Sequence, residues 1–251
     1  MHTPKIRLTN VHKDYISKRD ELKVLKDINL YVNKGEFVSI IGPSGCGKST
    51  IFHIITKLEK TYEGIVEIDG EPLEKSKERT GYMHQKDLLM PWRTLIDNVL
   101  LPLEIEGKNK KEAKEEVRKY FDVFGLEGFE EAYPNELSGG MRQRGALLRT
   151  FLVDSELLLL DEPFGALDAI NRSKMQEWLL KIWHQFKRSV LFITHDIEEA
   201  IYLSDRIYVL SERPAKVLKE VQIDFERPRK KDIVVTEKFL NYKKILMDSL
   251  K

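Results

Sequence analysis

A glycine-rich run that ends in a lysine and two hydroxyl residues is the part of the chain whose residue types most directly imply chemistry. The run reads Gly42-Pro43-Ser44-Gly45-Cys46-Gly47-Lys48-Ser49-Thr50 and fits the spacing of a phosphate-binding loop. Glycines let such a backbone approach phosphate closely, because a Cβ would block the approach and forbid the required dihedral angles. Backbone N–H groups and the N-terminus of a following helix then face the anion. The run therefore predicts a nucleoside triphosphate site.

The sequence on both sides of the loop supports this interpretation. Residues 37–41 are mostly apolar before the loop and residues 51–55 are mostly apolar after it, which is the strand–loop–helix context of such sites. In that context Lys48 would reach the β and γ phosphates, and the Ser49 hydroxyl would bind Mg²⁺. The alternative is a glycine-rich turn that contains Gly-Lys-Ser by chance. Cys46 would contribute only its backbone N–H, with a redox role as a minor alternative.

Two neighbouring carboxylates could supply the rest of the chemistry. The four leucines at 157–160 are too few for a lone helix and suit a buried parallel strand. That strand would deliver Asp161 and Glu162 at its carboxyl end, where α/β sheets bind ligands. Asp161 is expected to hold Mg²⁺ through water, and Glu162 to accept a proton from an attacking water. The alternative is an ordinary polar strand end.

The elements that must position these residues alternate between strands and helices. Residues 5–41 read as β, a helix is expected from Lys48 to about Leu58, and Asp69-Gly70 predicts a hairpin. Residues 109–124 have one apolar helical face, and Ser138 is placed to cap a helix that runs to about residue 152. Buried strands are then expected near 190–194 and 207–210, with a long helix before them and a last helix near 239–246. The pattern predicts a parallel-sheet core interrupted by a helical insertion near residues 88–154.

Composition bounds the possible functions. The chain has 251 residues, with 42 Lys and Arg against 41 Asp and Glu, so no basic field attracts nucleic acid. One cysteine excludes an internal disulfide and fits a reducing compartment. No apolar stretch approaches the roughly 20 residues needed to cross a bilayer, and residues 1–5 lack the apolar core of a signal peptide. We expect a cytoplasmic protein unless a partner holds it at a membrane.

A second motif resembles one family closely. The run Leu137-Ser138-Gly139-Gly140-Met141-Arg142-Gln143-Arg144 matches the signature motif of the ATP-binding subunits of ABC transporters, which other phosphate-loop classes lack. Four further matches occur in the family's order: the adenine-stacking aromatic Tyr15, the Q-loop residue Gln85, the D-loop Ala166-Leu167-Asp168 and the switch histidine His195. The resemblance covers about residues 5–225.

The resemblance implies roles for these residues. Tyr15 would offer its ring face to adenine at small conformational cost. Gln85 would contact both the metal and the lytic water, and His195 would reach the γ-phosphate and stabilise the transition state. Taken alone, Tyr15 reads more readily as a core residue and His195 as a structural one.

The signature motif also implies a second copy of the chain. Ser138, Gly139 and Gly140 would present a hydroxyl, bare backbone and a helix N-terminus to the γ-phosphate that another protomer holds, with Asp168 close to the nucleotide. Two half-sites per chain imply a head-to-tail homodimer that forms on ATP binding, with two ATP and their Mg²⁺ between the protomers.

The expected fold is α/β: a P-loop NTPase (RecA-like) parallel-sheet core with an antiparallel β subdomain and a helical insertion subdomain. Residues 1–251 would form a single nucleotide-binding domain. Its catalytic core lobe would comprise residues 1–87 and 155–225, its helical signature lobe residues 88–154, and its tail residues 226–251.

The implied function is ATP hydrolysis that drives a membrane importer. Residues 141–144 and 85–92 resemble the branch that serves nitrate, sulfonate, taurine and thiamine-precursor uptake. Expected partners are integral membrane permease subunits and, indirectly, a periplasmic or extracellular solute-binding protein, with the chain peripheral on the cytoplasmic face of the membrane and no nucleic acid bound. The alternatives are a non-transport ABC ATPase acting on nucleic acid or ribosomes, a small-molecule kinase, and a regulatory module that binds ATP without hydrolysis.

The largely apolar run at 88–92 predicts the surface that contacts the permease. Burial within the helical lobe explains the same run almost equally well.

Overall fold

The computed structural model describes residues 3–16, 21–165 and 167–250, and it divides into two compact units. The first unit joins Met1–Glu78 to Trp183–Lys251, and the second is Arg79–Ile182. The predicted helical lobe, 88–154, falls inside the second unit, and its exact limits stay a prediction.

The first unit contains an antiparallel sheet built by the N-terminal part of the chain. Its strand order among the described residues is β2-β1-β4-β5. The bounds are β1 (Ile6–Ile16), β2 (Glu21–Val32), β4 (Glu63–Ile68) and β5 (Glu71–Pro72). A two-residue turn at Asp69-Gly70, with both residues at positive φ, joins β4 to β5 and confirms the predicted hairpin.

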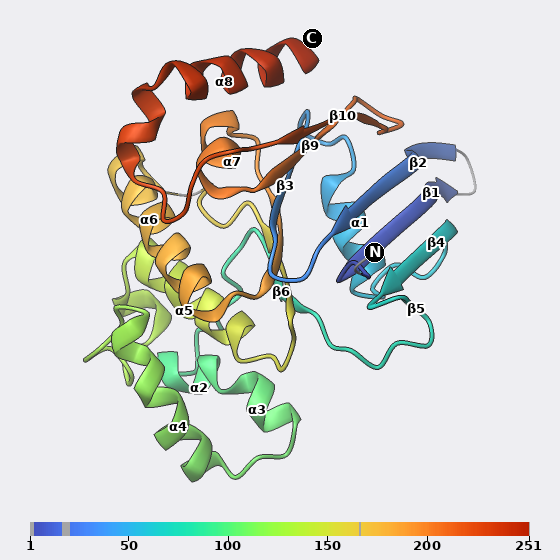
Figure 1. The fold of residues 1–251 in the computed structure, drawn as a ribbon. Helices are drawn as coiled ribbons and strands as arrows, with labels where there is room; N and C mark the ends of the chain where they lie inside the picture. The colour runs from blue at the N-terminus through green and yellow to red at the C-terminus, as the bar shows by residue number, and fades with distance from the viewer. Residues whose placement is uncertain (1–2, 17–20, 166, 251) are drawn as a thin grey trace. The chain divides into compact units, whose positions relative to one another are not determined.

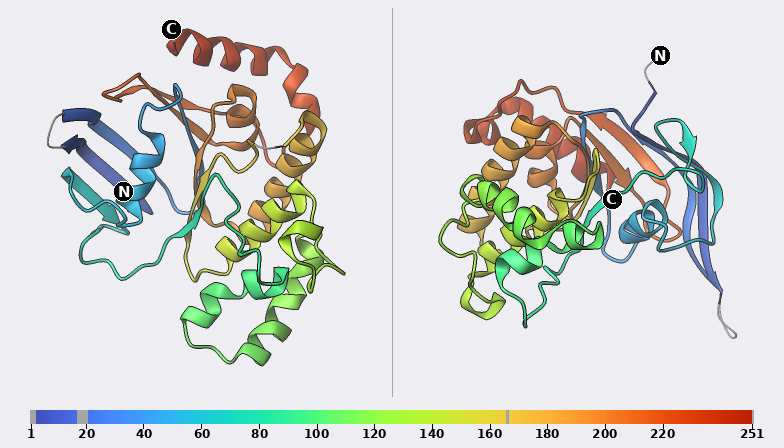
Figure 2. Two further views of the ribbon diagram at one scale, coloured as in Figure 1. Left: turned by 180° about the vertical axis from the view of Figure 1, so that it is seen from behind. Right: turned by 90° about the horizontal axis from the view of Figure 1, so that it is seen from below.

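The same unit carries the strands that lead to the phosphate-binding loop. β3 pairs in parallel with β8 and β9, and β9 pairs antiparallel with β10. Their bounds are β3 (Phe37–Ile41), β8 (Ser189–Ile193), β9 (Arg206–Leu210) and β10 (Val217–Gln222). Every residue of β3, β8 and β9 is buried, as parallel strands covered on both faces should be. Helix α1 (Lys48–Ile55) lies between these strands and the antiparallel sheet (Figures 1 and 2).

The second unit is mainly helical. Its parallel strands are β6 (Gly81–Met83) and the fully buried β7 (Leu157–Asp161). Its helices are α2 (Leu95–Val99), α3 (Leu101–Ile105), α4 (Lys110–Val123), the short η1 (Pro134–Glu136) and α5 (Gly139–Phe151). An aromatic cluster forms part of its core, with the Phe124 ring 5.7 Å from Phe151 and 5.2 Å from Trp178. Trp178 belongs to α6 (Ala169–Phe186), which begins in this unit and ends in the first.

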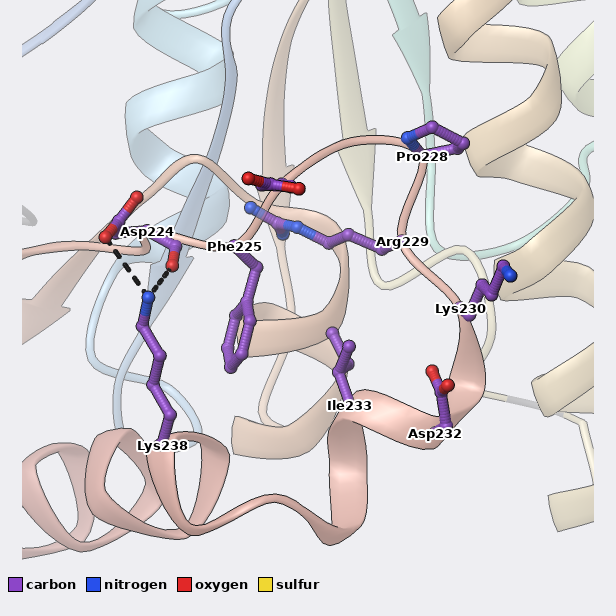
Figure 3. A pocket seen from close by; sticks show the side chains of 9 residues that line it. Asp224, Phe225, Pro228, Arg229, Lys230, Asp232, Ile233 and Lys238 are labelled. Atoms are coloured by element: carbon purple, nitrogen blue, oxygen red, sulfur yellow. Dashed lines mark hydrogen bonds and ion pairs between the residues drawn. The ribbon is translucent and has the colours of Figure 1, made fainter.

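The C-terminal segment, residues 224–249, belongs to the first unit. It contains the short helix η2 (Lys231–Val235) and the predicted last helix, α8 (Glu237–Ser249). α8 packs against α7 (Ile197–Leu203). The segment lines a pocket of about 470 Å³, at whose edge Lys238 of α8 donates to the Asp224 carboxylate (Figure 3). No helix among the described residues has both the length and the apolar character that a membrane span requires.

These observations confirm the predicted α/β class: mixed parallel and antiparallel strands with helices, a β subdomain and a helical insertion.

Candidate functional site

The phosphate-binding loop connects β3 to α1, as its flanks predicted. Gly45 and Gly47 have φ angles of +75° and +122°, which L side chains rarely adopt. A Cβ at Gly47 would also come within 2.7 Å of the Val24 side chain. The loop therefore needs glycine at this position for both conformation and space.

Lys48 lies inside this loop. Its Nζ donates to the carbonyl oxygens of Gly42 at 2.8 Å and Pro43 at 3.0 Å, and the residue is only 6% exposed. The ammonium is thus held inside the loop by the loop's own carbonyl groups. Cys46 is buried, and this burial raises the pKa of its thiol despite the nearby Lys48. A thiolate is accordingly disfavoured there, which argues against a redox role.

Tyr15 lies near the end of β1 and is 38% exposed. The ammonium of Lys13 lies 4.5 Å from the Tyr15 ring centroid, a cation–π contact on the ring. Lys13 is itself fixed by Glu59, 3.1 Å away, and by the carbonyl of Thr61, 2.6 Å away. Tyr15 is therefore a partly exposed ring held on a buried support, which suits stacking on a base.

His195 lies two residues after the end of β8 and is exposed. The next residue, Asp196, caps α7 by accepting from the backbone N–H groups of Glu198 and Glu199. The backbone N–H of Asp196 donates to the Thr194 hydroxyl at 3.0 Å. His195 thus lies at the junction between a buried strand and a capped helix.

In the second unit, β7 presents Asp161 and Glu162 at its carboxyl end, as predicted. Asp161 is 6% exposed, and its Oδ2 accepts from the Tyr82 hydroxyl at 3.3 Å. Burial, with the charge of Asp161, raises the pKa of Tyr82, so the phenol stays a donor. A buried carboxylate oriented by a phenol suits a hard cation such as Mg²⁺, which prefers oxygen ligands.

Glu162 adopts a φ of +46°, an unusual backbone conformation for a side chain of this kind. Its Oε2 accepts a hydrogen bond from Gln85 Nε2 at 3.0 Å. The structure therefore joins the predicted base directly to the predicted Q-loop residue, which lies 77 positions earlier in the chain.

Ser138 is the N-cap of α5, and its hydroxyl accepts from the N–H of Met141 at 3.3 Å. Gly139 and Gly140 form the first turn, where a Cβ would have no contact closer than 3.9 Å. A side chain at either position would meet only ordinary van der Waals contacts within this unit, so neither glycine is crowded. Asp168 caps α6 in the same way, accepting from the N–H groups of Ile170 and Asn171, and these bonds lower its pKa, that of Asn171 most. Ala166 lies outside the described residues.

The predicted site residues thus fall in both units. Tyr15, the phosphate-binding loop and His195 belong to the first, and Gln85, the signature residues, Asp161, Glu162 and Asp168 belong to the second.

The sequence did not indicate how the loop after Gln85 is tied to the signature helix. Asp87 Oδ2 accepts from Arg142 Nε at 3.2 Å, and Arg149 donates to the carbonyls of Asp87 at 2.6 Å and Leu88 at 2.8 Å. Arg142 also donates to the Leu137 carbonyl at 2.7 Å. The only sequence signal for these contacts was that α5 contains several arginines, and this does not identify the residues that the arginines contact.

Comparison with known proteins shows the family. Residues 25–165 match the model of the ABC transporter family. The chain belongs to that family. It is an ABC ATPase.

Two relatives and one solved structure give the closer context. An aliphatic sulfonates import ATP-binding protein of Bacillus cereus is 44% identical over 90% of this chain and 89% of its own length. The formylaminopyrimidine import ATP-binding protein of Halalkalibacterium halodurans is 46% identical over 86% of this chain and 83% of its own. A structure described as the dimeric post-hydrolysis state of an ATP-binding cassette with ADP and Pi superposes with a TM-score of 0.77 at 32% identity, covering 88% of this chain and all of that one.

Proposed function

We propose that this protein is the ATPase subunit of an ABC importer for a small anion or metabolite, such as nitrate, a sulfonate, taurine or a thiamine precursor. The two relatives named for sulfonate and formylaminopyrimidine import support this solute class. The solute would be selected by a binding protein and permease subunits, which this chain would serve from the cytoplasmic face of the membrane.

The site residues have separate roles in ATP binding and hydrolysis. The loop N–H groups and Lys48 bind the triphosphate, and Tyr15 stacks on the adenine. Ser49, Asp161 and Gln85 would hold Mg²⁺, and the ion would supply positive charge for the phosphates. Glu162 accepts the proton of the attacking water, and His195 donates to the γ-phosphate as its charge develops.

One observation carries this proposal furthest: the 3.0 Å hydrogen bond between Gln85 and Glu162. A general base must be oriented as well as basic, and an amide donor to one carboxylate oxygen fixes the direction of the other. Gln85 also begins the loop that presents Leu88, 52% exposed, and Trp92, 74% exposed. A permease that binds this loop would therefore act on the base through one side chain.

The loop run divides into exposed and buried residues. Leu89 is 7% exposed and belongs to the core of the second unit, whereas Leu88 and Trp92 are available to a partner. The burial interpretation of residues 88–92 therefore applies to Leu89, and contact with the permease stays a prediction for Leu88 and Trp92. Exposed apolar side chains of this size suit a protein interface.

A head-to-tail dimer with ATP between the protomers is the proposed working state. The related cassette is described as dimeric. Ser138 and Gly139 at the α5 N-terminus are exposed, and a helix N-terminus favours an anion.

The test is growth on single nutrient sources. A strain without this gene should fail to grow with one of nitrate, taurine, an alkanesulfonate or a thiamine precursor as the required nutrient. The wild-type gene should restore growth, and a Glu162→Gln gene should not, although the variant accumulates normally. Growth of the deletion strain on every one of these sources would refute the proposed solute class. Restoration by Glu162→Gln would refute the proposed role of hydrolysis.

A further inference from the structure

Helix α7 begins two residues after His195 and has seven residues. So short a helix has few internal hydrogen bonds and depends on its ends for stability. Its N-terminus is capped by Asp196. Its last four carbonyl groups have no partner within the helix, as at any helix C-terminus, and must be satisfied by other groups.

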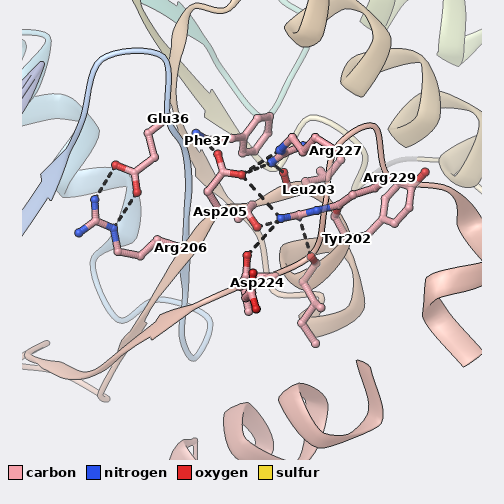
Figure 4. A network of polar contacts seen from close by, with 12 residues as sticks. Glu36, Phe37, Tyr202, Leu203, Asp205, Arg206, Asp224, Arg227 and Arg229 are labelled. Carbon is pink, nitrogen blue, oxygen red and sulfur yellow. Dashed lines mark hydrogen bonds and ion pairs between the residues drawn. The ribbon is translucent and has the colours of Figure 1, made fainter. Parts of the chain in front are cut away.

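The Ala200 carbonyl accepts from the N–H of Ser204, the residue that ends α7. Two arginines of the C-terminal segment satisfy the other three carbonyls and that of Ser204 (Figure 4). Arg229 Nη1 donates to the carbonyl oxygens of Ile201 at 3.1 Å, Tyr202 at 3.1 Å and Ser204 at 2.7 Å. Arg227 Nη2 donates to that of Leu203 at 2.7 Å. The positive charge of these arginines is also stabilised near the C-terminus of α7, which is the negative end of the helix dipole.

The arginines are rigidly placed. The Arg229 side chain is fully buried, and Arg227 donates to Asp205 Oδ1 at 2.8 Å while its guanidinium lies 4.1 Å from the Trp183 ring centroid. The other oxygen of Asp205 accepts from the N–H of Phe37, the first residue of β3, at 3.0 Å. Burial and the neighbouring Arg227 lower the pKa of Arg229 to about 10, so it stays charged at neutral pH.

The C-terminal segment also contacts α7 away from its C-terminus. Lys243 of α8 donates to Glu198 at 2.6 Å, and the Lys231 ammonium lies 4.4 Å from the Tyr202 ring centroid. The segment therefore holds α7 along its length, while β8 holds the chain on the other side of His195.

We propose that Arg229 and Arg227 are positioning residues for His195: they fix α7 and thereby the junction that aims the imidazole. This inference rests on the proposed role of His195 in hydrolysis. A misplacement of about 1 Å in a catalytic group costs about 10²-fold in rate. Release of α7 should consequently lower kcat and leave ATP binding nearly unchanged, since no ATP-binding residue lies on α7.

The test compares three variants at a temperature where each is folded. Arg229→Met removes the donors and keeps an apolar stem, whereas Arg229→Lys keeps the charge and three N–H donors. Arg206→Met is the matched control, because Arg206 is also fully buried but is held by Glu36 and Glu220. The readouts are hydrogen exchange of α7 amides by mass spectrometry, kcat and KM for basal ATPase, and the Kd for ATP.

For Arg229→Met we expect exchange in α7 at least about tenfold faster, kcat lower by about 10- to 100-fold, and KM within about twofold. Arg229→Lys should recover part of the exchange protection of α7 and part of the kcat that Arg229→Met loses. Arg206→Met should lower the melting temperature without changing α7 exchange or the kcat of folded protein. Should Arg229→Met fail to fold, Arg229→Lys and Arg227→Lys take its place with smaller effects of the same sign.

Unchanged α7 exchange in Arg229→Met would overturn the proposal, as would faster exchange with unchanged kcat. A rise in KM or Kd in place of the fall in kcat would also overturn it. Failure of the proposed role of His195 would be seen separately, because His195→Ala would then have the kcat of the wild type. The α7 exchange measured in Arg229→Met does not depend on the role of His195.

Discussion

Glu162→Gln tests most directly the proposed ATP site that two copies of the chain would share. The substitution removes the proposed base but keeps the size of the side chain and an oxygen that can accept from Gln85 Nε2, 3.0 Å away in the wild type. ATP should therefore bind and persist unhydrolysed. The γ-phosphate of each bound ATP would recruit Ser138 and Gly140 from a second chain, so ATP would hold the dimer together.

The magnitudes follow from these contacts. A positioned general base contributes about 10²- to 10⁴-fold, so kcat should fall by that factor. Because the bond to Gln85 can persist, the free energy of unfolding should change by no more than about 0.5 kcal/mol. Glu162→Ala is the matched control: it also loses the bond to Gln85, worth about 0.5–1.5 kcal/mol, and should be both inactive and less stable.

Light scattering gives the assay. Glu162→Gln should become dimeric with ATP and remain monomeric with ADP, because a ligand that binds the dimer better shifts the equilibrium by mass action. Adding Ser138→Arg should fill the half-site at the α5 N-terminus and abolish dimerisation, while each monomer still binds ATP. A Glu162→Gln protein that stays monomeric at high concentration and saturating ATP would refute the shared site. Dimerisation untouched by Ser138→Arg would refute only the role of Ser138 across the interface.

Three further predictions follow from the same contacts. Lys48→Ala deletes a charge-assisted contact to phosphate that is worth about 1.5–3 kcal/mol, so calorimetric titration should show at least tenfold weaker ATP binding. Near wild-type affinity would contradict the assignment of this loop to phosphate binding. Trp92→Glu should abolish transport in membranes that contain the permease without changing basal ATPase or melting temperature, whereas Leu89→Glu should lower all three because Leu89 is buried; equal behaviour of the two variants would refute the division of this loop. Arg206→Met leaves the Glu36 carboxylate, 12% exposed, without its ion-pair partner, which costs about 3–5 kcal/mol of folding stability. The double variant Arg206→Met/Glu36→Gln should recover part of the lost melting temperature, and a purely steric role of Arg206 would not produce this recovery.

The sequence predicted the parts of the fold that depend on local patterns. The strand–loop–helix at residues 37–55, the buried leucine strand, the Asp69-Gly70 hairpin and the Ser138 cap depend on neighbouring residues and were all confirmed. Helix ends were less predictable. α1 ends at Ile55, three residues before the predicted Leu58, since Thr56 turns its hydroxyl back to the Phe52 carbonyl and the next residue adopts positive φ.

Contacts between distant residues could not be predicted. Ile170 has helical spacing with the buried residues of α6 but is 70% exposed, because periodicity cannot show where a neighbouring layer stops. The bonds of Asp87 to α5 and of Arg229 to α7 join residues that are 55 or more and 25 or more positions apart, respectively. Arginine has no pattern that distinguishes a solvated side chain from one that caps a buried helix. Their roles therefore emerge only when the chain is folded.

The bonds around Asp87 also limit how the second unit can respond to a partner. Gln85 contacts the base, and Asp87, two residues later, is bound by Arg142 and Arg149 of the signature helix. A partner that displaces the exposed Leu88 and Trp92 must either break these bonds or move the helix with the loop. Breaking them would take from Arg149 its bonds to the carbonyls of Asp87 and Leu88, and from Arg142 its bond to the Asp87 carboxylate, which is costly where these groups are partly buried. Movement of the loop and helix together costs less, so docking at the loop, the position of Gln85 and the orientation of the signature motif are expected to change as one.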